Sequence, residues 1–363
     1  MTLPLFLFFL FLVSLALSWI GAVLTRQLAW SLKAIDQPAG GRKIHRHPTP
    51  LLGGIGIGIT MIVLIYLGLD QGWFASQQIH PLQLWGFISA IALLLIVGYA
   101  DDRWDVSVWW RSMAYALACI IIVATGTGIH QVTDWGGGGV IALDRWIWHS
   151  SFFGVLLSLS FPGDLLTISW LLAVLYATKF LDGLDGLVSG QTMIGAGLIV
   201  FLTLSPMFYQ PSVAVLAMIV FGAFAGFLPS NFSPAKQFLG ESGSVIAGFS
   251  LGFLSIVSGA KVATAFMAIG IPLADALFVV LGRCLRGTSP FQGDDTHLHF
   301  KLVRWGMSQR QVVCLYWCLA LGAGVLAFGL QTRGKFLLMV ALLLGTAVFS
   351  WFVGFRINRK KHK

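Results

Sequence analysis

The sequence predicts an all-α fold, a polytopic membrane helix bundle of about 11 transmembrane helices with the N-terminus outside and the C-terminus in the cytoplasm. The first observation is composition: 57% of the 363 residues are hydrophobic and only 10% are charged, whereas a soluble domain is usually about 25% charged. A soluble fold of this size cannot bury so much apolar surface, so lipid is the expected solvent. Continuous apolar runs also exclude the alternating pattern of a membrane barrel, which leaves a helix bundle.

The second observation is the number of apolar runs close to the ~20 residues that a membrane-crossing helix needs. A further segment, 146–164, is apolar but interrupted by Pro162 and Gly163, and we interpret it as an interfacial or re-entrant piece. Neither repeats nor a second domain are evident, so residues 1–363 are expected to form one integral-membrane domain. The predicted spans are 3–24, 52–69, 82–100, 112–129, 165–181, 188–204, 212–228, 244–258, 261–281, 312–329 and 336–355.

The third observation is where the basic residues lie. The first run has no basic stretch before it, which argues against a cleaved signal peptide and for a retained helix. With the N-terminus outside, the inner segments hold 19 of the 23 Lys and Arg residues. Such a bias follows the positive-inside rule. The net charge of +9 is therefore explained by topology and by attraction to anionic lipid heads, and nucleic-acid binding is not indicated.

The acidic residues gather on the same predicted inner face. Two carboxylates, Asp101 and Asp102, stand side by side directly after the apolar run 82–100. In "KFLDGLDGLVSG" (179–190), Asp182 and Asp185 are three residues apart and share a face if the segment is helical. Glu241, in "FLGESGSV", is the only glutamate of the chain. Adjacent acids repel one another, so a bound cation is expected to neutralise them.

Histidines and basic side chains are predicted to join these acids. His297 and His299 alternate in "THLHFKLVRW", with Arg304 close behind, and His45 lies in the basic stretch "DQPAGGRKIHRHPTP". The histidines suit either a metal or a phosphate, since both ring nitrogens can donate hydrogen bonds when the ring is charged. Hard carboxylate oxygens suit Mg²⁺, which is typically held by one or two carboxylates together with substrate phosphates and water. The combination predicts phosphoryl-type transfer at the inner membrane surface, with a lipid as one substrate.

With these segments in place, the chain resembles the polyprenyl-phosphate N-acetylhexosamine-1-phosphate transferase family, glycosyltransferase family 4. The resemblance is spread over nearly the whole chain, and the order and spacing of its motifs make it specific. It is carried by "DQPAGGRKIHRHPTPLLGG", "GYADDRWDVS", "FLDGLDGLVSG", "FLGESGSVIAGF", "IPLAD" and "SPFQGDDTHLHFKLVRWGMSQRQ".

The resemblance implies an enzyme of the cell (cytoplasmic) membrane with its active site on the cytoplasmic face. It implies transfer of GlcNAc-1-phosphate, or a related sugar-1-phosphate, from a UDP-activated N-acetyl sugar to undecaprenyl phosphate, with release of UMP. That product starts a surface glycan such as O-antigen or teichoic acid. Mg²⁺ is the implied cofactor, with Mn²⁺ as an alternative. The implied catalytic residues are Asp101, Asp102, Asp182 and Asp185; the implied metal ligands are Asp102, Glu241 and Asp101; the implied substrate-binding residues are His297, His299, Lys179, Arg304 and His45.

Three positions depart from the family pattern. Lys179 stands where Asn often precedes the D-G-x-D-G acids, Glu241 replaces an Asp that usually binds metal, and Phe300 takes the place of a final histidine. Two alternatives stay open: the peptidoglycan enzyme that uses UDP-N-acetylmuramoyl-pentapeptide, and an ion-coupled membrane transporter. The oligomeric state is also open, with a homodimer as one alternative.

Overall fold

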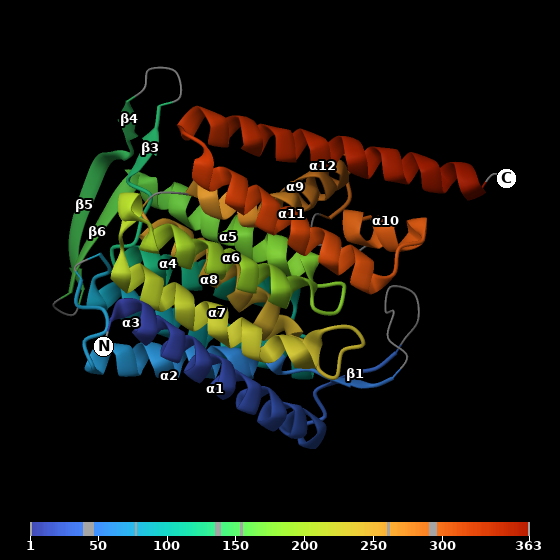
Figure 1. Ribbon diagram of the computed structural model, residues 1–363, viewed down its shortest axis with the longest axis horizontal. Coiled ribbons are helices and arrows are strands. Elements are labelled where there is room, and N and C mark those ends of the chain that lie inside the picture. Colours follow the sequence, from blue (N-terminus) through green and yellow to red (C-terminus); the bar gives the residue numbers. More distant parts are fainter. Residues whose placement is uncertain are drawn as a thin grey trace.

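A computed structural model describes residues 2–38, 47–76, 78–134, 139–152, 155–259, 262–289 and 296–361. Most of these residues form one bundle of long helices (Figure 1). Each of the eleven predicted runs lies wholly or mostly in a helix, although the run 112–129 continues past the helix end at Ala124. The helices are α1 (Leu3–Ser31), α2 (Gly53–Asp70), α3 (Pro81–Trp104), α4 (Val108–Ala124), α5 (Gly163–Leu181), α6 (Leu187–Leu204), α7 (Pro211–Asn231), α8 (Gly240–Val257), α9 (Val262–Leu285), α10 (Leu298–Trp305), α11 (Gln309–Gly329) and α12 (Thr332–Lys361).

Nine helices of the described chain are long and apolar enough to cross a membrane, which indicates a multi-pass membrane protein. Helix α4, at 17 residues, is shorter than that set, and α10 is a short helix within a stretch that we expected to be a loop. In a bilayer every backbone N–H and C=O needs an internal partner, and a helix provides one for each group of its interior. The need to pair every backbone polar group inside the membrane therefore explains both the long apolar runs of the sequence and the helices that they form.

The all-α prediction is wrong in three places, where the described chain forms two-stranded antiparallel sheets. β1 (Ile35–Asp36) pairs with β2 (Thr49–Pro50), and β3 (Gln131–Thr133) pairs with β4 (Val140–Ala142). The interrupted apolar segment forms the longest hairpin, in which β5 (Asp144–Phe152) pairs with β6 (Val155–Pro162). Aromatic and β-branched residues favour strands, and Pro162 ends the run before a helix can form. The interfacial position of this segment stays a prediction.

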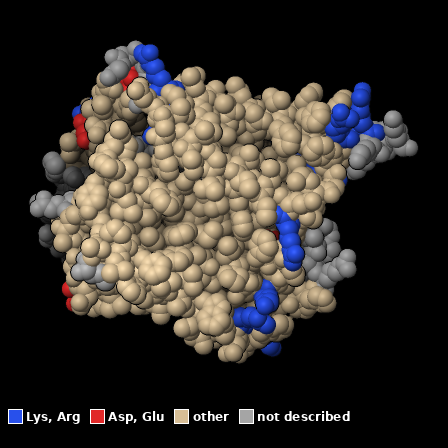
Figure 2. All heavy atoms as spheres, viewed as in Figure 1, with Lys and Arg blue, Asp and Glu red and all other residues tan. Residues whose placement is uncertain are grey.

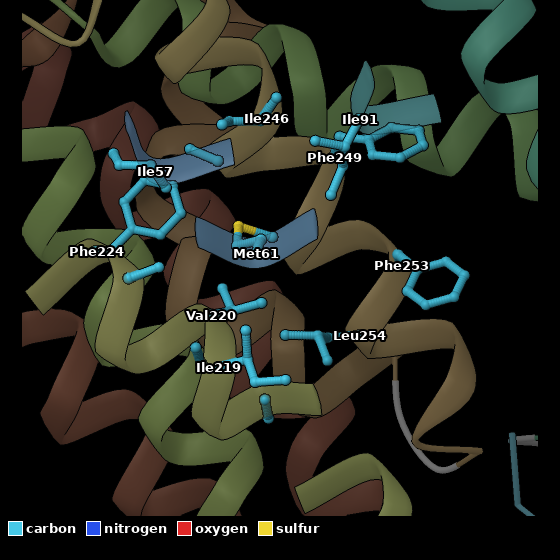
Figure 3. Close-up of a cluster of buried hydrophobic side chains, with 14 of the residues drawn as sticks. Ile57, Met61, Ile91, Ile219, Val220, Phe224, Ile246, Phe249, Phe253 and Leu254 are labelled. Atoms are coloured by element: carbon cyan, nitrogen blue, oxygen red, sulfur yellow. The ribbon is translucent and has the colours of Figure 1, made fainter. Parts of the chain in front are cut away.

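The hydrophobic core is centred on α8, which packs against α2, α3, α5 and α7. Figure 3 shows side chains from four of these helices meeting there, including Met61 of α2, Ile91 of α3, Phe224 of α7 and Phe249 of α8. Close to them, the ring of Phe87 stacks on that of Phe253 with centroids 4.3 Å apart. This packing fixes the ends of α3 and α5 against the first turn of α8.

Basic side chains are concentrated at one end of the bundle. Figure 2 shows a broad uncharged side, with most of the visible Lys and Arg at the end where β1 and the C-terminus lie in Figure 1. The two ends of the chain lie at opposite ends of the bundle (Figure 1). Because α1 runs towards the β1 end, α2 returns from it and α3 runs towards it again, the carboxylate pair that closes α3 lies at that basic end.

Candidate functional site

The polar centre forms where the last turn of α3 meets the first turn of α8. The Oδ1 atom of Asp102 accepts a hydrogen bond from the backbone N–H of Glu241 at 2.8 Å. Gly240, just before, has φ +72°, and a Cβ there would collide with the Asp102 carboxylate. Only glycine adopts this backbone conformation without strain. The small residue before Glu241 is therefore required for the two acids to approach.

Two cations hold the neighbouring acids. The Nη1 atom of Arg111, in the first turn of α4, lies 2.7 Å from Oδ2 of Asp101 and 3.8 Å from Oε1 of Glu241. The ammonium of Lys179, in the last turn of α5, forms an ion pair with the same Oε1 atom. These four side chains are only 11–19% exposed. Burial at this level makes the pairings stronger than those of a surface ion pair.

Tyr115 completes the network one helical turn after Arg111. Its hydroxyl donates a hydrogen bond to Oε1 of Glu241, and Lys179 Nζ lies 3.3 Å from the hydroxyl oxygen. The ammonium also lies 5.2 Å from the centre of the tyrosine ring. Glu241 is thus held through a single oxygen by groups from two other helices.

Two carboxylate oxygens in this cluster have no hydrogen-bond partner in the described structure. They are Oδ1 of Asp101 and Oδ2 of Asp102, and both are buried. An unpaired buried carboxylate oxygen is costly, and such groups in native proteins commonly mark a binding site. Within the described ranges, no three His, Cys, Asp or Glu side chains converge as a ready metal cage. A divalent cation held by two carboxylates, water and substrate phosphate needs no such cage, so the two oxygens fit Mg²⁺.

The D-G-L-D-G turn lies between α5 and α6 and separates its two acids. Although Asp182 is an exposed residue, desolvation by the atoms packed around its carboxyl, and then the charges of Glu241 and Asp185, raise its pKa to about 7. A cation placed near it would favour the charged form and lower that pKa. The Oδ2 atom of Asp185 accepts a hydrogen bond from the backbone N–H of Ala235 at 3.0 Å. The charge of Asp182 therefore interacts with that of Glu241 in the polar centre. Asp185 instead holds the turn against the loop before α8.

The two predicted histidines are buried beside the same turn. Nδ1 of His297 lies 2.8 Å from Oδ2 of Asp275, and the other oxygen of Asp275 accepts the N–H of Leu298. His299 is wholly buried, neither of its ring nitrogens has a hydrogen-bond partner, and burial lowers its pKa to about 3. At pH 7 its ring is therefore neutral. A Cβ on Gly183 would lie 2.7 Å from Nε2 of His299, so the small residue inside D-G-L-D-G lets the histidine approach.

The structure thus brings together five predicted residues and places others apart. Asp101, Asp102, Lys179 and Glu241 form the polar centre, and Asp182 is electrostatically coupled to it. Arg304 lies exposed in the last turn of α10, the helix that carries His299. His45 lies outside the described residues, as do Asp294 and Asp295 of the expected acidic face. The roles assigned to these residues from the sequence stay predictions.

Sequence reasoning missed three members of the site. Arg111 was counted only as a topological charge and Tyr115 was not singled out, although their spacing of four residues puts both on one face of α4. Asp275, the last residue of the motif "IPLAD", was not predicted to pair with His297. A polar or ionisable residue inside a predicted span is a functional candidate by default, and this signal would have found Tyr115 in the span 112–129 and Asp275 in the span 261–281.

The fold and the site together define a multi-pass membrane protein whose helix ends carry a carboxylate centre suited to a cation and a phosphate. A family model described as glycosyl transferase family 4 matches residues 84–259, the stretch that supplies Asp101, Asp102, Arg111, Lys179 and Glu241. The chain is similar to glycosyl transferase family 4 over this stretch.

Characterised relatives are similar over most of their length. A probable undecaprenyl-phosphate N-acetylglucosaminyl 1-phosphate transferase of Bacillus subtilis is 28% identical over 309 residues, covering 84% of this chain and 79% of the relative. A decaprenyl-phosphate N-acetylglucosaminephosphotransferase of Mycolicibacterium smegmatis is 28% identical over 330 residues, covering 84% and 76%. An undecaprenyl-phosphate alpha-N-acetylglucosaminyl 1-phosphate transferase of Yersinia pestis is 28% identical over 337 residues, covering 88% and 81%.

Proposed function

We propose that this protein transfers GlcNAc-1-phosphate from UDP-GlcNAc to undecaprenyl phosphate, releasing UMP and starting a cell-surface glycan. The observation that carries the proposal is the pair of unpaired buried oxygens on Asp101 and Asp102, beside Arg111 and Lys179, in a chain similar to family 4. The names of the relatives support a polyprenyl phosphate as acceptor and N-acetylglucosamine phosphate as the transferred group. Residues 1–363 act as one transferase domain in this proposal.

The chemistry asks little of a general base. An oxygen of the lipid phosphate forms a bond to the sugar-bearing phosphorus of the UDP-sugar, while the bond from that phosphorus to the UMP oxygen breaks. A phosphate monoester has its second pKa near ~6, so the acceptor is already largely dianionic at pH 7. A bound Mg²⁺, or Mn²⁺ in its place, supplies neutralisation of pyrophosphate charge. Asp101 and Asp102 would hold that cation, and Arg111 keeps Asp101 oriented.

Asp182 and the histidines belong to the same proposed site. Asp182 lies one residue before the glycine against which His299 packs, so a ligand that reaches one of them lies close to the other. His299, neutral at pH 7, offers one donor and one acceptor. His297 is oriented by Asp275. We assign substrate positioning to His299, His45 and Arg304, and to Asp185 the fixing of the D-G-L-D-G turn against Ala235.

The active site is placed at the cytoplasmic face of the cell membrane. In this proposal the eleven long helices cross the bilayer, the N-terminus lies outside, and the basic end of the bundle lies in the cytoplasm. The opposite positions of the two chain ends in Figure 1 are consistent with an odd number of crossings. The distribution of Lys and Arg supports the orientation. A monomer holds every residue that the proposal uses, and a homodimer is compatible with it.

The orientation is tested by thiol labelling in intact cells. In a Cys-free variant, single cysteines at Ser107 and at Thr288, both exposed, are expected to resist an impermeant maleimide until the membrane is opened. A single cysteine at Thr133, exposed at the other end of the bundle, is the matched control and should label at once. Rapid labelling at both Ser107 and Thr288 contradicts the orientation and the cytoplasmic site with it.

The activity is tested with purified protein, undecaprenyl phosphate and a panel of UDP-sugars, with UMP measured. UDP-GlcNAc is expected to give the highest turnover, and omission of the lipid phosphate is expected to abolish UMP release. A lipid-linked muramoyl-pentapeptide product would instead identify the peptidoglycan reaction. Uptake of a solute into liposomes without any UMP release would contradict the transferase and favour transport.

Shortening Glu241 is expected to lower stability without improving turnover. Glu241→Asp withdraws the carboxylate by about one C–C bond, ~1.5 Å, and so removes its bonds to Lys179 and Tyr115. Each hydrogen bond to a charged group contributes roughly 1.5–3 kcal/mol, so with both bonds lost we expect the free energy of unfolding to fall by roughly 3–6 kcal/mol. Thermal unfolding in detergent and UMP release check both parts. A faster and equally stable Asp variant would show that the longer side chain has no purpose here.

A further inference from the structure

Two of the sequence's departures from its family pattern meet in space. Lys179 and Glu241 lie 62 residues apart in the chain, yet the ammonium of the first pairs with Oε1 of the second. The same oxygen accepts the hydroxyl of Tyr115 and lies 3.8 Å from Nη1 of Arg111. One carboxylate oxygen has few acceptor positions. Oε1 is therefore occupied by the protein's own donors before any metal arrives.

The net charge of the polar centre also depends on Lys179. Four carboxylates, on Asp101, Asp102, Asp182 and Glu241, are coupled there, and Arg111 and Lys179 supply two positive charges. If every carboxylate is ionised, two negative charges remain, which one divalent cation neutralises. A neutral side chain at position 179 would leave three. Lys179 therefore reduces the demand for cations at the site.

The carboxylate pair offers acceptor atoms that no donor of the protein occupies. The buried carboxylate oxygens without hydrogen-bond partners in the described structure belong to Asp101 and Asp102, and neither of these residues pairs with Lys179. The backbone N–H of Glu241 donates to Asp102, while the side chain of Glu241 pairs with Lys179 through Oε1. The cluster is thus divided into a carboxylate pair open to a cation and a carboxylate already paired with an ammonium.

We infer that Lys179 is a built-in counter-ion, which takes the cation position at Glu241 and confines a divalent metal to the free oxygens of Asp101 and Asp102. The inference rests on the proposed function for its biological meaning, since the metal serves that same site. Lys179 is then a positioning residue: it acts on the metal through Glu241 and through its charge. Replacing it by a neutral side chain frees Glu241 and removes a repulsive charge, and both changes strengthen metal binding.

The test is Mn²⁺ binding to the purified full-length protein, followed by electron paramagnetic resonance without nucleotide or lipid. Lys179→Gln is expected to bind Mn²⁺ roughly tenfold more tightly than the wild type, because one nearby positive charge in a partly buried site is lost. Lys179→Arg keeps the charge and is expected to stay closer to the wild type than the Gln variant does. Lys236→Gln, the same change at an exposed lysine of the α7–α8 loop, is the matched control and should leave the affinity unchanged.

A Lys179→Gln variant that binds Mn²⁺ no more tightly than the wild type overturns the inference, as does an equal gain in the Arg variant. If the Gln variant does not give a monodisperse folded protein, Lys179→Met makes the same charge change with an unbranched side chain, and the same outcomes apply to it. The readout contains no substrate. A failure of UMP release with the expected Mn²⁺ shift therefore rejects the proposed transfer and keeps the counter-ion, whereas the converse rejects the counter-ion alone.

Discussion

Asp102→Asn is expected to lower turnover by roughly 10³-fold, the size of effect seen when a key electrostatic group is removed from an active site, while the protein stays folded and inserted. Oδ1 of Asp102 accepts the N–H of Glu241 at 2.8 Å, and the amide oxygen of Asn can accept the same bond. What the substitution removes is the negative charge on Oδ2, the oxygen without a partner. In its place stands an amide N–H₂, which repels a cation. UMP release and the melting temperature in detergent measure the two parts.

Asp105→Asn is the matched control for this variant. It makes the same chemical change three residues later, at an exposed position that ends α3 with φ +51°, and Asn tolerates that left-handed conformation. Its turnover is expected to match the wild type. A near-normal rate for Asp102→Asn would remove the carboxylate pair from the mechanism, and a large loss in the Asp105 variant would attribute the effect to the local fold.

His299→Leu is expected to lower turnover by about 10²-fold without loss of stability. His299 is wholly buried and both its ring nitrogens lack partners, so the native side chain carries a desolvation cost of roughly 1–3 kcal/mol. Leucine of similar volume removes both polar atoms and breaks no hydrogen bond. The melting temperature should stay unchanged or rise, while a lost donor or acceptor for the ligand slows the reaction, as removal of a positioned acid–base group typically does.

His80→Asn tests whether any histidine change has this effect. His80 caps the start of α3 at the other end of that helix, and Asn is a good helix-capping residue. Its turnover should equal that of the wild type. A His299→Leu variant that keeps the wild-type rate at low UDP-sugar concentration would show that the buried ring serves only packing, with no part in binding.

The helices could be predicted because their cause is local. Lipid cannot satisfy a backbone polar group, so each crossing requires its own continuous apolar run, and every predicted run lies wholly or mostly in a helix. The carboxylate pair, the D-G-L-D-G acids and Glu241 were found for a related reason: charge at the end of an apolar run is costly, and so stands out in the sequence. The β-hairpins were missed because 146–164 is as apolar as a span. Its strand conformation depends on local breaks at Pro162 and on pairing with a partner strand.

The sequence by itself determined a multi-pass helical membrane protein with acids gathered near one face, together with the family pattern that they form. Only the tertiary structure decided which partners those acids have: Asp101 pairs with Arg111, Glu241 with Lys179 and Tyr115, and Asp185 with the backbone of Ala235. The physical reason is the distance along the chain over which each property is determined. Burial of an apolar run is a property of consecutive residues, whereas an ion pair between α5 and α8 depends on how glycines and core side chains far apart in the chain let those helices approach.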